Sequence, residues 1–157
     1  RFEHKGEFHG AAVYDDYAHH PGELSALLTT ARSLGYRRVI CAFQPHTYTR
    51  TKELFDQFVQ VLQLPDKVLL AEIFAARETD TLGISSRDLA QRIPGAEFCP
   101  TLEEVARRLA QLAQPGDLIL TVGAGDIYLA GERLLAAGTE VYRTDLHGTV
   151  TVRRNEA

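Results

Sequence analysis

The sequence contains no methionine, no tryptophan and only two cysteines among its 157 residues. Cys41 and Cys99 stand far apart in apolar surroundings, so neither a disulfide framework nor a zinc site is indicated. We expect both to be reduced thiols in the core of a cytoplasmic protein. No apolar run approaches the roughly 20 residues of a membrane-spanning helix, and no signal peptide is recognisable.

The sequence also has no excess of basic residues, since it contains 17 Lys and Arg residues and 21 Asp and Glu residues. The net charge of -4 gives no reason to expect nucleic acid, whose binders commonly carry a basic face. A hydrophobic content of 45% is enough for one domain with a real core. The abrupt start at Arg1, without a methionine, suggests a fragment of a longer protein.

Several catalytic motifs are missing as well. The sequence has no G-x-x-x-x-G-K-[ST] phosphate loop, no G-x-S-x-G nucleophile elbow and no H-E-x-x-H zinc helix. The stretch "GAGDI" at 123–127 is half of a dinucleotide fingerprint, but Tyr128 stands where the third glycine belongs. Close backbone packing at a strand end is the simpler interpretation of these glycines. The sequence therefore predicts a binding surface without catalytic machinery.

Apolar strands alternate with helical segments along the chain. After an opening hairpin over 2–14, strands are expected at 37–43, 66–73, 96–99 and 117–123. Helices are expected at 21–34, 54–62, 86–92 and 102–113, the last with a capping box of Thr101 and Glu104. Continuous apolar strands predict an α/β fold, a mostly parallel sheet of about six strands with helices on both faces. A polar tail is expected over 144–157, which leaves a domain over 1–143.

Unusual polar loops follow four of these strands: "DDYAHHP" at 15–21, "QPHTYTR" at 44–50, "EIFAARETD" at 72–80 and "GAGDI" at 123–127. Because the carboxyl ends of parallel strands meet at one edge of a sheet, we expect the loops to form one surface. It would gather the acidic, imidazole, phenol and guanidinium groups of Asp15, Asp16, His19, His46, Tyr48, Arg50, Glu72, Arg77 and Asp126. Such a surface suits a charged small molecule.

Simpler interpretations of these residues stay open. Either Asp15 or Asp16 could cap the helix that follows. The adjacent His19 and His20 should point in different directions and not chelate one metal ion. Arg50 could be a solvated residue at a helix start, but a cation is unfavourable there. A bound anion, held by Arg50 and by free N–H groups at the helix start, accounts better for its position.

Taken in order, "DDYAHHP", "FQPHTYTRT", "ARETDTLGIS" and "GAGDI" resemble the C-terminal domain of the Mur ligase family of peptidoglycan synthesis. The resemblance runs from "RFEHKGE" to "GERLL", nearly the whole chain. The "DYAH-x-P" element is shared with other Mur ligases and with folylpolyglutamate synthase, whereas "QPHTYTRT" is typical of the members that add L-alanine. The resemblance implies a Rossmann-like third domain, which follows a UDP-sugar domain and a central ATPase.

The activity that this resemblance implies is ATP-dependent amide-bond formation between L-alanine and UDP-N-acetylmuramate, in cell-wall biogenesis, cell shape and cell division. ATP would activate the muramyl carboxylate as an acyl phosphate, which the amino group of L-alanine attacks. The phosphate loop and the magnesium ligands would lie in the central domain. We therefore expect no catalytic residue and no metal ligand in this chain, which would bind L-alanine and close over ATP.

Carried over residue by residue, the resemblance implies an L-alanine site at Tyr17, His19, His46 and Arg50, and a nucleotide site at Asp16 and Tyr17. Asp15, Tyr48, Glu72, Arg77 and Asp126 would stand at the edge of this site. A planar guanidinium matches the carboxylate of an amino acid. Thr47 stands where many relatives carry arginine, so Arg50 must supply more of the positive charge.

Two alternatives to this function stay open. A ligase that recycles murein tripeptide shares the "DD-aromatic-A-H-H-P" element, although its second loop should differ from "QPHTYTR". A Rossmann-like binding module without catalytic partner domains is the other alternative. The parent reading frame distinguishes them, because a G-K-[ST] loop upstream supports a ligase.

Overall fold

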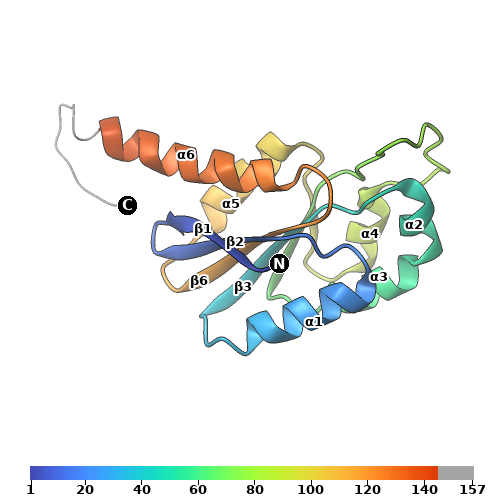
Figure 1. Cartoon of the computed structure of the whole chain (residues 1–157), viewed down its shortest axis with the longest axis horizontal. Coiled ribbons are helices and arrows are strands. Elements are labelled where there is room, and N and C mark those ends of the chain that lie inside the picture. The colour runs from blue at the N-terminus through green and yellow to red at the C-terminus, as the bar shows by residue number, and fades with distance from the viewer. Residues whose placement is uncertain (145–157) are drawn as a thin grey trace.

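A computed structural model describes residues 1–144 of the chain (Figure 1). Its sheet has six strands, which are β1 (Glu3–Phe8), β2 (Ala11–Asp16), β3 (Arg38–Phe43), β4 (Lys67–Leu70), β5 (Glu97–Phe98) and β6 (Asp117–Val122). The strand order is β1-β2-β6-β3-β4-β5. The β1–β2 hairpin is antiparallel and every other pair is parallel, as the sequence predicts.

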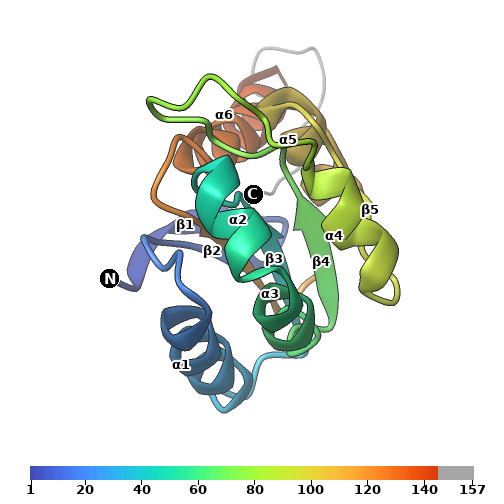
Figure 2. The same cartoon turned by 90° about the vertical axis from the view of Figure 1, so that its right-hand side faces the viewer.

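Helices cover both faces of this sheet. They are α1 (Pro21–Arg32), α2 (Tyr48–Glu53), α3 (Phe55–Val61), α4 (Ser86–Arg92), α5 (Leu102–Leu112) and α6 (Tyr128–Thr144). Figures 1 and 2 show α5 and α6 on one face and α1 and α3 on the other. The predicted three-layer architecture is confirmed. None of the helices in the described part of the chain combines the length and the apolar character needed to cross a membrane.

Two hydrophobic cores lie on opposite sides of the sheet. Successive residues of a strand point to opposite faces, so β3 sends Val39 and Cys41 to one core and Ile40 to the other. The first core includes Leu24 of α1, and the second includes Leu109 of α5. Because both faces are covered, β3 reads as a continuous apolar run instead of an alternating one.

Local sequence signals explain most helix starts. Thr101 and Glu104 form the predicted capping box, with the Glu104 N–H 3.1 Å from Thr101 Oγ1 and the Thr101 N–H 3.3 Å from Glu104 Oε1. Residues 86–92 form α4 as predicted. A tail was predicted over 144–157, but Thr144 still belongs to α6, and the rest of that range lies outside the described residues.

The region 48–62 departs from the prediction. One helix was expected from 54 after a polar loop, but two helices form, and α2 already begins at Tyr48. The helices meet at Leu54, whose φ of -106° and ψ of 22° interrupt the helical path. The early start depends on Thr47, whose carbonyl oxygen accepts from the Thr51 hydroxyl at 2.7 Å, and on a distant carboxylate described below. A prediction from local periodicity could not include that second contact.

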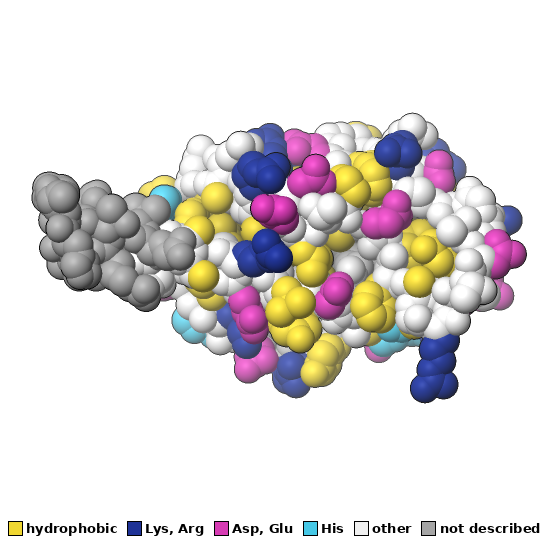
Figure 3. Space-filling model, turned by 90° about the horizontal axis from the view of Figure 1, so that it is seen from above, with side chains coloured by type: hydrophobic (Ala, Val, Ile, Leu, Met, Phe, Trp, Pro, Cys, Tyr) yellow, Lys and Arg dark blue, Asp and Glu magenta, His cyan; other side chains and the backbone are white. Residues whose placement is uncertain are grey.

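The face that carries α6 has a mixed surface. Figure 3 shows acidic and basic side chains interspersed on this face, with small apolar patches between them. No large patch of a single charge is visible on this face within the described residues.

Glu97 lies in β5, the strand at one edge of the sheet, and should make the stability of the fold depend on pH in the acid range. Its carboxylate accepts from Arg108 at 2.7 and 2.9 Å and lies 2.8 Å from Lys67 Nζ. The hydrogen bonds from Arg108, with those from Lys67, lower the pKa of Glu97 to about 2. A lowered pKa stabilises the folded state above the unfolded value near 4.5, and this contribution is lost as pH falls towards 2.

Glu97→Gln is therefore expected to cost roughly 1 kcal/mol of unfolding free energy at pH 6, because the ion pair is partly exposed to solvent and screened. The cost should shrink steadily below pH 4.5 and vanish only below pH 2. Urea unfolding of both proteins at several pH values measures the difference. A cost that stays constant with pH would show that the charge of Glu97 contributes nothing.

Candidate functional site

The four polar loops leave the sheet at one edge, as the parallel pairing requires. The Gly123 N–H donates to the Asp16 carbonyl at 3.0 Å, and the Gln44 N–H donates to the Val122 carbonyl at 3.0 Å. The Ala71 N–H likewise bonds the Phe43 carbonyl at 3.0 Å. These bonds tie together the ends of β2, β6, β3 and β4. The predicted shared edge is confirmed.

The "GAGDI" loop packs directly against the loop that follows β3. Gln44 donates through Nε2 to Asp126 Oδ1 at 2.8 Å, and Gln44 Oε1 accepts from the Ile127 N–H at 3.2 Å. A Cβ at Gly125 would lie 2.6 Å from Gln44 Oε1 and 2.6 Å from the Phe74 ring. The glycine is thus required for close backbone approach, which confirms the packing interpretation of this motif.

Three histidines gather where the loops after β2 and β3 meet. The ring centroids of His19 and His46 are 5.8 Å apart, and those of His19 and His20 are 5.2 Å apart. Burial lowers the pKa of His46, and the nearby His19 and Arg50 lower it further. The Nδ1 atom of His46 is buried and has no hydrogen-bond partner within the described structure. The structure therefore places His19 and His46 side by side, with Arg50 near enough to affect the pKa of His46.

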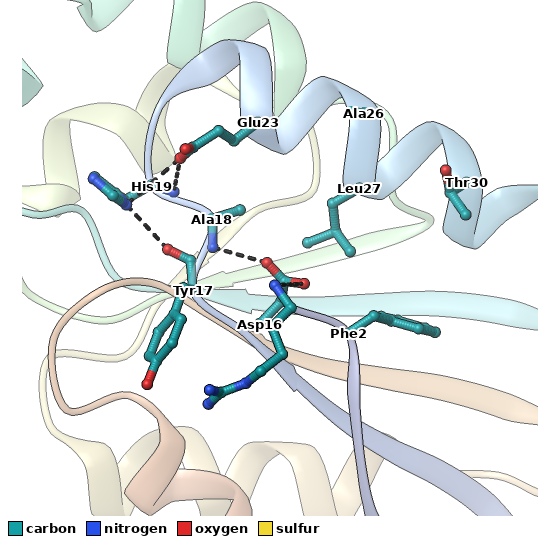
Figure 4. A pocket seen from close by; sticks show the side chains of 10 residues that line it. Phe2, Asp16, Tyr17, Ala18, His19, Glu23, Ala26, Leu27 and Thr30 are labelled. Atoms are coloured by element: carbon teal, nitrogen blue, oxygen red, sulfur yellow. Dashed lines mark hydrogen bonds and ion pairs between the residues drawn. The ribbon is translucent and has the colours of Figure 1, made fainter.

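A pocket of about 480 Å³ opens between the end of β2 and α1 (Figure 4). Asp16 and the exposed ring of Tyr17 border it, and Leu27 and Ala26 of α1 supply an apolar wall. Asp16 Oδ1 accepts from the Ala18 N–H at 2.9 Å, which holds the carboxylate at the pocket wall. The volume is within the range of small-molecule sites.

The alternative that Asp15 or Asp16 caps α1 is wrong. His20 stands at the N-cap position instead, and Glu23 completes a capping box, since its Oε1 accepts from the N–H groups of His19 and His20, each at 3.1 Å. These bonds lower the pKa of Glu23. Both aspartates lie in β2 instead, too early in the chain to reach the helix start.

Besides Asp126, which accepts from Gln44, two more of the residues predicted for the site edge have structural partners. Asp15 is buried and accepts from the Thr121 hydroxyl at 2.7 Å, and burial raises its pKa despite this bond. Glu72 accepts from the Ser85 hydroxyl at 2.8 Å and from the Ser86 N–H at 2.9 Å, and so fastens the start of α4. Arg77 is exposed and Tyr48 is half-buried at the start of α2.

A further carboxylate, Glu78, was not among the predicted site residues. Its Oε1 accepts from the N–H groups of Tyr48 at 2.6 Å and Thr49 at 3.1 Å, and its Oε2 accepts from the Thr49 hydroxyl at 2.5 Å. These hydrogen bonds, the Thr49 hydroxyl's above all, lower the pKa of Glu78. The expectation that free N–H groups at this helix start hold a ligand anion is therefore wrong, because Glu78 occupies them.

The structure is a three-layer α/β domain with a pocket of small-molecule size beside the carboxyl end of β2, at the edge where its polar loops meet. Within residues 1–144, no cluster of three or more His, Cys, Asp or Glu side chains could hold a metal ion. The family described as "Mur ligase, glutamate ligase domain" matches residues 1–125, and the chain belongs to this family.

Curated relatives carry a more specific name. The chain is 52% identical over 139 residues to a UDP-N-acetylmuramate–L-alanine ligase of Lachnospira eligens, a match that covers 86% of this chain and 30% of the relative. It is 48% identical over 143 residues to the ligase of that name from Clostridium botulinum, covering 88% of this chain and 31% of the relative. The chain thus spans less than a third of the length of these relatives.

Solved structures give the same result for the fold. The UDP-N-acetylmuramate–alanine ligase of Thermotoga maritima superposes with a TM-score of 0.68 at 25% identity, over 85% of this chain and 28% of that protein. A crystallised ligase domain from Haemophilus ducreyi superposes with a TM-score of 0.66 at 24% identity, over 87% of this chain and 98% of that domain. The chain therefore shares the fold of that domain.

Proposed function

We propose that this chain is the C-terminal domain of a cytoplasmic ligase that joins L-alanine to UDP-N-acetylmuramate in peptidoglycan synthesis, at the expense of ATP. Relatives near 50% identity bear this name. The observation that supports the proposal is the proximity of His19, from the loop after β2, to His46 and Arg50, from the loop after β3 and from α2. In this proposal the domain binds L-alanine and closes over the nucleotide that the rest of the ligase holds.

The three side chains suit the two charged ends of an amino acid. The Arg50 guanidinium matches the carboxylate of L-alanine. The lowered pKa of His46 keeps its ring neutral at pH 7, so the ring can hydrogen-bond to a substrate without adding a charge. His19 bonds the Tyr17 carbonyl through Nδ1 at 3.0 Å, which fixes its ring beside His46. Tyr17 then borders both the amino-acid site and the nucleotide.

The chain provides only part of a binding site for ATP and no clear site for magnesium within the described residues. The pocket beside Asp16 and Tyr17 offers a carboxylate and an exposed aromatic ring to part of a nucleotide. The sequence has no phosphate loop, and residues 1–144 contain no cluster of metal ligands. In this proposal, the phosphates and Mg²⁺ are bound mainly by the central ATPase domain. ATP would supply the activation of the muramyl carboxylate.

Alone, the chain is expected to show neither ATP hydrolysis nor ligation. Phosphoryl transfer requires a phosphate cradle and a positioned metal ion, and the chain supplies neither motif. Phosphate release and L-alanine coupling, measured for the purified chain beside the whole ligase, check this expectation. ATP-dependent coupling of L-alanine by the chain itself would contradict it.

The amino-acid substrate is tested with the whole ligase from the parent gene. L-alanine should be coupled to UDP-N-acetylmuramate, whereas murein tripeptide should not replace it. Coupling of the tripeptide in place of L-alanine would identify a recycling ligase. A parent gene without an upstream G-K-[ST] loop would instead favour a binding module.

A further inference from the structure

The turn that carries the proposed L-alanine site has a strained backbone. Thr47 has a φ of 69° and a ψ of 146°. Positive φ is unusual for any residue except glycine and is a genuine outlier for a β-branched one. Such conformations persist only where surrounding contacts over-determine them, and they cluster at functional sites. Contacts around Thr47 must therefore impose this conformation.

Some of these contacts come from the segment that follows β4. The Thr47 N–H donates to the Phe74 carbonyl at 2.8 Å, and the Phe74 N–H donates to the Pro45 carbonyl at 2.9 Å. His46 and Phe74 thus form a parallel β-bridge outside the main strands. This bridge holds the turn from its N-terminal side and leaves the direction of α2 to other contacts.

Glu78 holds the turn from the other side. Its carboxylate accepts two N–H groups and one hydroxyl from Tyr48 and Thr49, the first two residues of α2. A helix of six residues is too short to be stable by itself. The direction of α2 therefore depends on its anchors, and Arg50 is the next residue along it. Arg50 also donates its backbone N–H to Thr47 Oγ1 at 3.3 Å.

We propose that Glu78 is a positioning residue for amino-acid binding: by anchoring the start of α2 against the strained Thr47 turn, it aims Arg50 at the substrate carboxylate. This inference rests on the proposed function. Glu78 does not bind the substrate in this scheme, since its acceptor atoms are already taken by α2. Its effect on L-alanine passes entirely through the placement of Arg50.

The test compares Glu78→Gln with wild type in the whole ligase. The amide keeps the shape of the side chain but loses the charge and one acceptor oxygen. The KM for L-alanine should rise roughly ten-fold, less than the about hundred-fold that a misplacement of about 1 Å can cost. The KM for ATP, kcat and the melting temperature should stay near the wild-type values. A general loss of structure would instead change all four.

Two further variants sharpen the test. Thr49→Val removes one donor to Glu78 and should raise the KM for L-alanine, whereas Thr49→Ser keeps the hydroxyl and should behave as wild type. Glu7→Gln is the matched control, because Glu7 is exposed and pairs with Ala12, at the opposite end of β2 from the site. Its kinetics should not change.

An unchanged KM for L-alanine in Glu78→Gln would overturn the inference and leave Glu78 as a simple helix cap. A lowered KM would also overturn it, because Glu78 would then act by repelling the substrate carboxylate. Failure of the proposed function appears differently, since the wild-type ligase would not couple L-alanine at all.

Discussion

Replacing Asp117 with asparagine is expected to lower the free energy of unfolding of the chain by about 3 kcal/mol. The Asp117 side chain is fully buried at the start of β6. It accepts from Arg38 Nε at 3.1 Å, from Arg38 Nη2 at 2.7 Å, from Arg37 Nη1 at 3.2 Å and from the Gln114 N–H at 2.9 Å. Burial alone would raise the pKa of Asp117, but these hydrogen bonds outweigh it and the pKa is lowered.

Asparagine would keep the shape of the side chain but turn an N–H₂ group towards a guanidinium. The loss should lie at the lower end of the range for buried pairs, because Arg38 can still reach solvent. Urea unfolding at pH 7 measures it. Arg37→Gln is the control, since the Arg37 side chain is 53% exposed and its ion pair should contribute less than about 1 kcal/mol. Equal losses in both variants would contradict this account.

The fold was predictable because its signals are local. The β-branched run in β3 and the Thr101 capping box each determine their element from a few neighbouring residues. Because strands alternate with helices along the chain, the sheet is expected to be parallel and covered by helices on both faces. The early start of α2 could not be predicted in the same way. It depends on Glu78, which lies 30 residues further along the chain than Tyr48.

The candidate site was predictable to the extent that topology determines it. Parallel strands bring their carboxyl ends to one edge, so the proximity of His19 and His46 follows from the order of the elements. The partners of individual carboxylates do not follow from that order. Asp15 and Glu72 resemble ligand-binding residues in the sequence, yet the first bonds Thr121 within the sheet and the second fastens α4. In a sequence, a loop carboxylate that binds a ligand cannot be distinguished from one that bonds another part of the fold.

Replacing Arg50 with alanine in the whole ligase is expected to raise the KM for L-alanine much more than the KM for ATP. The Arg50 side chain is half-buried, and it forms no ion pair within the described residues. Because Glu78 occupies the N–H groups at the start of α2, the backbone there cannot compensate for the lost guanidinium. In the proposed site, Arg50 supplies the positive charge that the carboxylate of L-alanine would meet.

The loss of a charge-assisted hydrogen bond costs about 1.5–3 kcal/mol, which corresponds to a roughly ten- to hundred-fold rise in the KM for L-alanine. Arg50→Lys should fall between alanine and wild type, because an ammonium keeps the charge but not the planar fork. Arg107→Ala is the matched control, since Arg107 is exposed on α5. Stability should change little, because Arg50 is outside both cores. If steady-state kinetics of Arg50→Ala gave an unchanged KM for L-alanine, Arg50 would be a solvated residue of α2 and the carboxylate would bind elsewhere.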